Sequence, residues 1–430
     1  MLARGVLKRT GVNMKILSRK TAVFTLIQAV LMVGTLPAVA GEVAIEDGVT
    51  TVRNAQPALP AVELQLEELW RRGGDDDDLM IGLPVEAMSD DAGRVYLADQ
   101  QLCQVFVFNA DGELEKTLSR EGEGPGEVAY PIDMVDLPDG TLGLAEFFPG
   151  KIVKVTRDDL PAGEITIDVS GGVTGGFTIQ TMAEAVGPHL VMAGSRSLPQ
   201  DKFTERTHFL AAVDQEGNQT VRYMEQVSYI ERPHSVVHED DFLPSFPLAS
   251  ALGPDGRVYT PRDRENYAIN VFHPDGTLDR VIERPGFKTW KRNKLDTRRV
   301  TALFESWAGA NPETWPEFDL KKTERAINTL HIDGQGRLWV QHSRSNRDLP
   351  AGTFLSLDLY DKAGNWQREV RLNCEGNSVS DGVRFLRDGR ILLIKGFVVA
   401  RLACLGSGVA TLGEDETEVI EIVCYKLPEV

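Results

Sequence analysis

The chain is built from short runs in which apolar and polar residues alternate, each preceded by a turn rich in aspartate and glycine. This pattern is typical of β-hairpins, because successive side chains on a strand point to opposite faces. One signature, Gly-Arg followed by two apolar or aromatic residues, recurs at Gly93–Tyr96, Gly256–Tyr259, Gly336–Trp339 and Gly389–Leu392, with weaker copies at Gly140–Leu142 and Gly187–Leu190. Copies at intervals of roughly 50 to 80 residues indicate an internal structural repeat.

A second hairpin follows the first in most of these units. Its first strand ends just before another glycine turn, as in Val105–Phe108, Leu210–Val213, Ile269–Phe272 and Leu357–Tyr360. Each unit therefore holds four short strands. Six such units predict an all-β fold, a six-bladed β-propeller with four-stranded blades. Two tandem β-sandwiches are the alternative.

The last unit has no obvious fourth strand of its own. The alternating run Val62–Leu66, far upstream, is a candidate to supply it and so to close the ring with an N-terminal strand. Closure of this kind removes an open sheet edge, which would otherwise favour aggregation.

The unusually long segments between predicted strands all fall on one face of the propeller. The longest, residues 286–325, lies between blades 4 and 5 and contains a predicted helix near Thr297–Ala308. It also contains Trp290, Trp307 and Trp315. These rings either form a platform for a ligand or fix the insertion to the blades. Length variation concentrated on one face is typical of a scaffold that carries function in its loops.

The same residues carry a family resemblance. The stretch Glu121–Glu127 before Pro131–Asp133, together with the Gly-Arg repeats, resembles exported bacterial six-bladed propellers related to NHL-repeat and TolB-like proteins. The resemblance covers roughly residues 80–427 and implies the fold. It leaves the function open, because such propellers include both binding proteins and enzymes.

The N-terminus carries an export signal. Residues 1–40 hold six basic residues and no acidic one, with an apolar run over Ala22–Leu36 and an A-x-A site at Ala38–Ala40. This predicts a signal peptide over 1–40, starting at Met1 or Met14, although a membrane anchor is the alternative. We expect a linker and the ring-closing strand over 41–79, and the propeller over 80–430. The protein should be periplasmic or extracellular.

Charge narrows the range of partners. The 430 residues include 64 acids and 46 bases, and removal of the signal peptide leaves 40 bases and a net charge of −24. Such a surface disfavours nucleic acids and anionic membranes. Of the four cysteines, Cys374 and Cys404 are expected on adjacent blades and are a candidate disulfide; free thiols are the alternative.

Candidate ligand residues come from the innermost strands. Counting back seven or five residues from each marker glycine gives positions on one side of the strand, which should face the central channel. The polar ones are Glu86, Asp133, Gln180, Thr329, His331 and Arg384. Such a ring could hold a hard cation, with Glu86 and Asp133 as ligands, or a small polar molecule.

A second candidate cluster is His234 and His238, which could ligate zinc if they shared a helical face. No catalytic motif is recognisable. We therefore expect an exported, monomeric scaffold that binds a protein partner or a small polar ligand on its loop-rich face. The alternative is a calcium- or zinc-dependent hydrolase such as a lactonase, or a lyase, at the mouth of the channel. A structural role in an envelope assembly is a third possibility.

Overall fold

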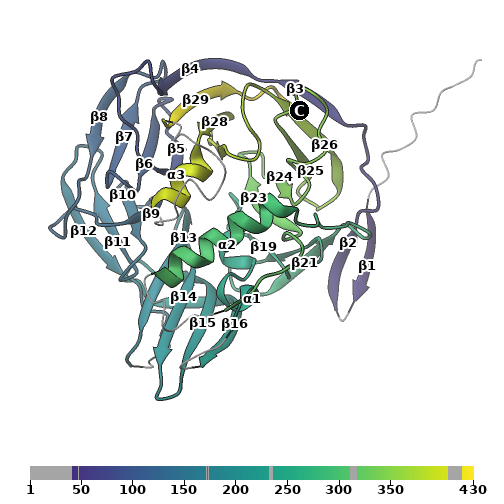
Figure 1. The fold of residues 1–430 in the computed structure, drawn as a ribbon, viewed down its shortest axis with the longest axis horizontal. Coiled ribbons are helices and arrows are strands. Elements are labelled where there is room, and N and C mark those ends of the chain that lie inside the picture. The colour runs from purple at the N-terminus through teal and green to yellow at the C-terminus, as the bar shows by residue number, and fades with distance from the viewer. Residues whose placement is uncertain are drawn as a thin grey trace, which may run out of the picture. The chain divides into compact units, whose positions relative to one another are not determined.

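The computed structural model describes residues 41–46, 48–170, 172, 174–231, 236–309, 317–404 and 419–430. Within them, six four-stranded antiparallel units are arranged around a central channel (Figure 1). The protein is thus a six-bladed β-propeller, as the repeats predict. No helix in the described part of the chain is long and apolar enough to cross a membrane.

Each of the first three blades is a single continuous stretch of chain. Blade 1 contains β5 (Pro84–Ser89), β6 (Val95–Asp99), β7 (Gln104–Phe108) and β8 (Leu114–Leu118). Blade 2 contains β9 (Pro131–Asp136), β10 (Leu142–Glu146), β11 (Lys151–Val155) and β12 (Pro161–Thr166). Blade 3 contains β13 (Phe177–Val186), β14 (His189–Pro199), β15 (Phe203–Val213) and β16 (Gln219–Glu231), and its strands are the longest in these three blades.

The last three blades are completed by the N-terminal segment. Blade 4 contains β18 (Ala251–Leu252), β19 (Val258–Pro261), β20 (Ala268–Phe272) and β21 (Leu278–Glu283), with β2 (Val49–Arg53) and β1 (Glu42–Glu46) added at its outer edge. Blade 5 contains β23 (Ile327–Ile332), β24 (Leu338–His342), β25 (Leu355–Tyr360) and β26 (Trp366–Asn373), and gains β3 (Val62–Gln65). Blade 6 contains β27 (Gly382–Phe385), β28 (Arg390–Lys395), β29 (Glu421–Lys426) and β4 (Glu67–Gly73). We call residues 41–73 the strap.

Ring closure by an N-terminal strand is confirmed, but the strand is not the predicted one. The run Val62–Leu66 forms β3, which pairs in parallel with β26 of blade 5, with Val62 opposite Val370. The fourth strand of blade 6 is β4, antiparallel to β29. Both segments alternate apolar and polar residues, and alternation predicts a strand without choosing its partner. Trp70 on β4 then packs against Phe108 of blade 1, with ring centroids 5.7 Å apart.

Apolar side chains pack between neighbouring blades. Buried clusters fill the junctions between blades 1 and 2, 2 and 3, 3 and 4, 4 and 5, 5 and 6, and 6 and 1. Leu64 of the strap contributes to the junction of blades 5 and 6, and Trp70 to the junction of blades 6 and 1. Burial of this apolar surface is the main force that holds the blades in a ring.

All helices of the described residues lie in connections that reach one face, here called the helical face (Figure 1). They are α1 (Glu239–Phe242), the 3₁₀ helix η1 (Phe246–Leu248), α2 (Lys294–Gly309) and α3 (Phe397–Cys404). The short strands β17 (Val237–His238) and β22 (Phe318–Asp319) pair beside them. The helix predicted near Thr297–Ala308 is α2, between blades 4 and 5. Residues Gly194–Thr207, which the sequence pattern places among the long segments between strands, are instead part of the long hairpin of β14 and β15.

Candidate ligand site in the central channel

The innermost strands of the six blades line a cavity of about 800 Å³. It is lined on the helical face by residues 247–250, in η1 and just after it, and by Phe397, Val398 and Arg401 of α3. At the opposite end it reaches the first turns of the blades, including Asp333 and Arg387. A volume of this size is within the range of small-molecule sites, roughly 300 to 1,000 Å³.

Most of the residues proposed from the sequence do line this cavity. They are Glu86, Asp133, Thr329, His331 and Arg384. They come from β5, β9, β23 and β27, the innermost strands, as do neighbouring residues such as Ala87 and Met134, which also line the cavity.

Gln180 does not line the channel. Its side chain is fully buried, and neither of its amide atoms has a hydrogen-bond partner in the structure. The prediction was wrong because blade 3 begins with a shorter turn. Val186 pairs directly with His189, which leaves a two-residue turn, whereas Ser89 and Val95 of blade 1 enclose five residues. Counting seven residues back from Gly187 therefore passes the β-bulge that follows Gln180.

The channel residue of blade 3 that the sequence count missed is Glu184. It lines the cavity, and its Oε2 accepts a hydrogen bond from the backbone N–H of Leu252 in blade 4 at 2.6 Å. The available signal was the tight Gly187-Pro188 turn, which brings the channel position of this strand closer to the turn than the count from the other blades assumed. Among the described residues, Oε1 of Glu184 has no hydrogen bond.

Three carboxylates from successive blades thus reach the channel. Glu86 accepts a hydrogen bond from the N–H of Ala87 at 2.9 Å. Asp133 accepts one from Met134 and one from Ala183 of blade 3, each at 2.8 Å. Contacts to the next blade by Asp133 and Glu184 link the innermost strands of blades 2, 3 and 4.

Burial raises the pKa of all three carboxyl groups. For Asp133 the pKa lies well above its usual value, because the charge of Glu86 adds to the effect of burial. Burial raises the pKa of Glu184 to about 8, against the opposing hydrogen bond from Leu252. Burial also raises the pKa of Glu86, which the guanidinium of Arg384 partly opposes. At neutral pH this wall therefore retains protons that ordinary carboxylates have lost.

The wall formed by blades 5 and 6 has a different chemistry. Arg384 lies 3.5 Å from Glu86 and donates two hydrogen bonds to the carbonyl of Val85, at 2.6 and 3.1 Å. Its side chain is 22% exposed and that of Glu86 is 31% exposed, so both keep contact with the channel. His331 stacks on Phe385 with ring centroids 4.4 Å apart. Burial lowers the pKa of His331 to about 4, so this imidazole is neutral at pH 7.

The channel residues do not fit a metal ion. Among the described residues, no group of three His, Cys, Asp or Glu side chains is gathered closely enough to hold one. Glu86 and Asp133, the predicted ligands, both accept backbone hydrogen bonds instead. We therefore derive no chemical step that uses calcium or zinc.

The histidine pair is not brought together on a helix. His234 lies outside the described residues, and His238 belongs to β17, an extended segment. Its Nδ1 lies 2.9 Å from Oδ2 of Asp319 on β22, and both side chains are more than half exposed. The β-branched side chains of Val236 and Val237 favour this extended conformation.

The cysteines are free thiols in the structure, so the predicted pair is not formed. Cys374 packs at the junction of blades 5 and 6, in the cluster that contains Leu64. Cys404 lies at the end of α3, which packs against blade 1, and its thiol faces Oε1 of Gln101 at 3.8 Å. The direction of α3 separates two residues that the sequence places on adjacent blades.

The long insertion is fixed to the blades by polar contacts. The indole N–H of Trp290 donates to Asp296 at 2.9 Å, and its backbone N–H donates to Ser343 of blade 5. The guanidinium groups of Arg344 and Arg347 lie 5.4 and 5.2 Å from its ring. For Trp290 the anchoring interpretation is therefore the better one. Trp315 and the side chain of Trp307 lie outside the described residues.

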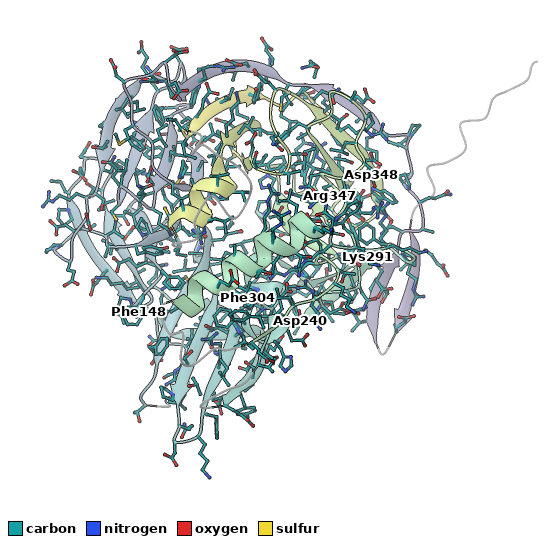
Figure 2. The ribbon with its side chains drawn as sticks, viewed as in Figure 1. Phe148, Asp240, Lys291, Phe304, Arg347 and Asp348 are labelled. Carbon is teal, nitrogen blue, oxygen red and sulfur yellow. The ribbon has the colours of Figure 1, made fainter. Side chains whose placement is uncertain are left out.

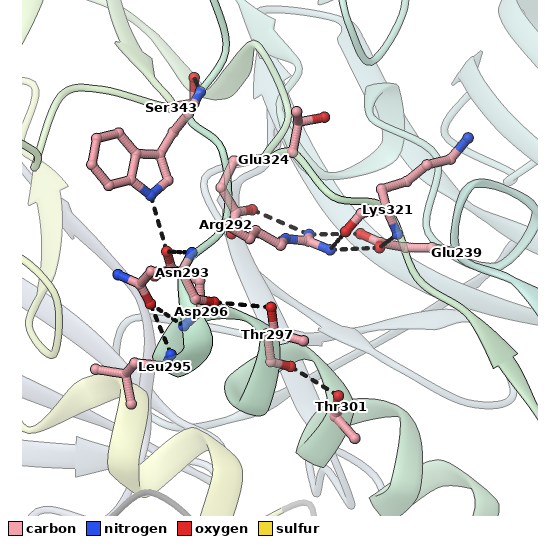
Figure 3. A network of polar contacts seen from close by, with 12 residues as sticks. Glu239, Arg292, Asn293, Leu295, Asp296, Thr297, Thr301, Lys321, Glu324 and Ser343 are labelled. Carbon is pink, nitrogen blue, oxygen red and sulfur yellow. Dashed lines mark hydrogen bonds and ion pairs between the residues drawn. The ribbon is translucent and has the colours of Figure 1, made fainter.

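Glu239 is the centre of this anchor. It is buried, and it accepts a hydrogen bond from Arg264. It also accepts hydrogen bonds from both terminal nitrogens of Arg292 and from the backbone of Lys321 (Figure 3). These partners lower the pKa of Glu239 to about 2 against the effect of burial. Figure 2 shows Phe304 on α2 and Arg347 near one end of the helix, where Arg347 donates a hydrogen bond to Asp296 at 2.6 Å.

Comparisons with known proteins agree with the fold. Residues 76–180 match a family described as a 6-bladed beta-propeller. A search of curated proteins found no match to this chain.

Three similar solved structures are matched over almost their whole length. A Bacteroides fragilis protein described as exported is 11% identical, with 86% of this chain and 100% of that chain covered and a TM-score of 0.47. Virginiamycin B lyase from Staphylococcus aureus is 11% identical, over 84% and 99%, with a TM-score of 0.37. Regucalcin from Agrobacterium tumefaciens, a calcium-binding protein, is 10% identical, over 85% and 97%, with a TM-score of 0.41. At these values they carry no argument about the site of this chain.

Proposed function

We propose that this protein is an exported, monomeric scaffold that binds a small, positively charged ligand in its central channel. The observation that supports this function most strongly is the presence of carboxylates from blades 1, 2 and 3 in one cavity of about 800 Å³. The ligand would enter from the helical face, where α3 and the residues after η1 border the cavity. The signal peptide predicted over residues 1–40 supports export.

The protonation of the channel supports a cationic ligand. Glu86, Asp133 and Glu184 all have raised pKa values, chiefly because of burial, and the charge of Glu86 adds to this effect for Asp133 and Glu184. A positive charge placed between them favours their ionised forms. Binding should therefore release protons and become tighter as the pH rises from about 6 to about 8.

The opposite wall supports a ligand that also has a flat or apolar part. Arg384 is directed to Val85 and Glu86, so it offsets the charge of Glu86. Arg387, which also lines the cavity, is paired with Asp136 and lowers the pKa of Glu184 only against the larger effect of burial. His331 and Phe385 offer stacked rings on this side. A ligand with a cationic group at one end and an apolar or aromatic group at the other matches both walls.

Titration calorimetry tests this function. The probes are 1,4-diaminobutane, as a small organic cation, and calcium chloride. We expect the diamine to bind the parent protein, and Asp133→Asn and Glu184→Gln to weaken that binding at least about tenfold, or roughly 1.4 kcal/mol each. Glu216→Gln, an exposed acid in a turn of blade 3, is the matched control and should bind as the parent does.

Two results would count against the proposal. The first is an absence of heat with the diamine, or equal binding by the channel variants and the control. The second is tight binding of one equivalent of calcium in place of the diamine. That outcome would favour the metal-dependent hydrolase or lyase that the sequence leaves as an alternative.

A further inference from the structure

Gly41, the first residue after the predicted cleavage site, lies in a built contact at the junction of blades 4 and 5. Its backbone nitrogen donates to Oδ1 of Asn365, in the turn between β25 and β26, at 3.0 Å. No side chain fits here: a Cβ on Gly41 would lie 2.7 Å from Oδ1 of Asn54 and 2.9 Å from Cγ1 of Val52. The backbone of Gly41 is therefore held close against the strap and blade 5 together.

Asn365 is itself held in place. Its side-chain N–H₂ donates to both carboxylate oxygens of Asp361, at 3.2 and 3.0 Å, which orients Oδ1 away from Asp361 and toward Gly41. Asn54 completes the contact by accepting a hydrogen bond from the N–H of Trp366 and donating one to the carbonyl of Gly364. The acceptor for the nitrogen of Gly41 is thus fixed by a network that spans the strap and blade 5.

We infer that the α-ammonium group released by cleavage of the signal peptide docks on Asn365 and locks the strap to blades 4 and 5. The inference rests on the export proposed above. A signal peptidase hydrolyses the Ala40–Gly41 bond with one water molecule, which leaves a carboxylate on Ala40 and an ammonium group on Gly41. The nitrogen that donates to Asn365 as an amide then donates as a cation, and hydrogen bonds from charged donors are the stronger ones.

The charges around this position favour an ammonium group. The carboxylate of Asp361 lies directly behind the amide of Asn365. Arg280 of β21 contacts the same turn but donates to the carbonyl of Ala363 at 2.8 Å. Arg53, next to Val52, is paired with Glu46 and Glu283. The guanidinium groups of Arg280 and Arg53 therefore each have an acceptor other than Asn365 and Asp361.

The test measures the reactivity of the α-amine in the exported protein. Intact mass first establishes the N-terminal residue. A succinimidyl ester is then applied at neutral pH, and label is counted on the tryptic peptide of residues 41–53, which contains no lysine. A docked ammonium should react about tenfold more slowly than a free one, because it is held protonated and covered. Asn365→Ala should restore the faster rate.

The matched control is Asn218→Ala. Asn218 makes the same contacts to Asp214 in the equivalent turn of blade 3, but it has no contact with Gly41. A chain that starts at Ala40 moves the amine by one residue without changing the fold, and it should also react quickly. Equal rates in the parent, in Asn365→Ala and in the Ala40 chain would overturn docking. An exported chain that begins elsewhere than Gly41 would overturn it at the first step, separately from any failure of the channel to bind a ligand.

Discussion

Blades 1–3 and blades 4–6 share the same four-stranded architecture but differ at both their inner and outer edges. The first three carry one channel carboxylate each, Glu86, Asp133 and Glu184, and receive no strand from the strap. On their innermost strands the last three line the channel with Arg384, His331 and mostly apolar residues, and each blade pairs with part of the strap. Asp333 and Asp381 reach the cavity from connections between strands, where they accept hydrogen bonds from Trp339 and Gly396. The half of the ring that supplies the acidic wall is thus distinct from the half that supplies closure.

This difference suggests that stability and binding can be separated by mutation. Changes in the strap, or in the anchor of the insertion, should affect unfolding and leave the titration of the channel unchanged. Changes in the channel carboxylates should alter binding and the pH dependence of stability. The predictions below test this separation, from the largest expected effect to the smallest.

Trp70→Ala should have the largest effect. Trp70 is 7% exposed, and it joins the strap to blade 1 through Phe108 and Gly112. Removal of a buried tryptophan costs about 3–5 kcal/mol, because the site cannot collapse to fill the cavity. Urea unfolding measures the loss. Leu69→Ala, in the same strand but 43% exposed, is the control and should change stability by about 0.5 kcal/mol or less.

A loss of less than about 1 kcal/mol for Trp70→Ala would contradict closure through this strand, since that value is typical of surface changes.

Glu239→Gln should destabilise the protein by about 3 kcal/mol, because it leaves the buried guanidinium groups of Arg264 and Arg292 with less compensating charge. Thermal unfolding measures the effect. Asp240→Asn is the control, since Asp240 is a third exposed and should contribute about 1 kcal/mol or less. Similar melting temperatures for the two variants would show that the insertion does not depend on Glu239.

Glu184→Gln should change the pH dependence of stability rather than its maximum. The pKa of Glu184 rises from 4.5 to about 8 on folding, so the unfolded chain ionises first. The contribution of Glu184 to the free energy of unfolding is therefore complete below about pH 4.5 and is lost as the pH rises toward 8. The variant should not show this decline. At pH 8 its free energy of unfolding should exceed that of the parent by about 1–3 kcal/mol, a range that allows for water in the channel.

Urea unfolding at pH 5, 6.5 and 8 measures this effect, with Glu216→Gln as the control. A constant difference between Glu184→Gln and the parent at all three pH values would show that Glu184 titrates normally.

The repeats were enough to predict the propeller, because each blade carries its own turn glycine and strand pattern. Five of the six channel residues were also placed on the correct face. Gln180 and Glu184 were not, since the length of the Gly187-Pro188 turn sets the register of β13 and the count assumed a longer turn. The partner of β4 and the direction of α3 depend on contacts distant in sequence, which local patterns do not encode. For that reason Val62–Leu66 was wrongly predicted to complete blade 6, which β4 completes, and Cys374 and Cys404 were wrongly predicted to pair.

The most direct test of the central claim is the number of protons released when 1,4-diaminobutane binds at pH 7. Titration calorimetry in two buffers of different ionisation enthalpy gives this number. We predict a net release of protons in the parent and a smaller release in Glu184→Gln, because the carboxylates of blades 1–3 hold protons that a cation displaces. Binding without any exchange of protons, or an equal release in the parent and Glu184→Gln, would contradict the assignment of this wall as the ligand site.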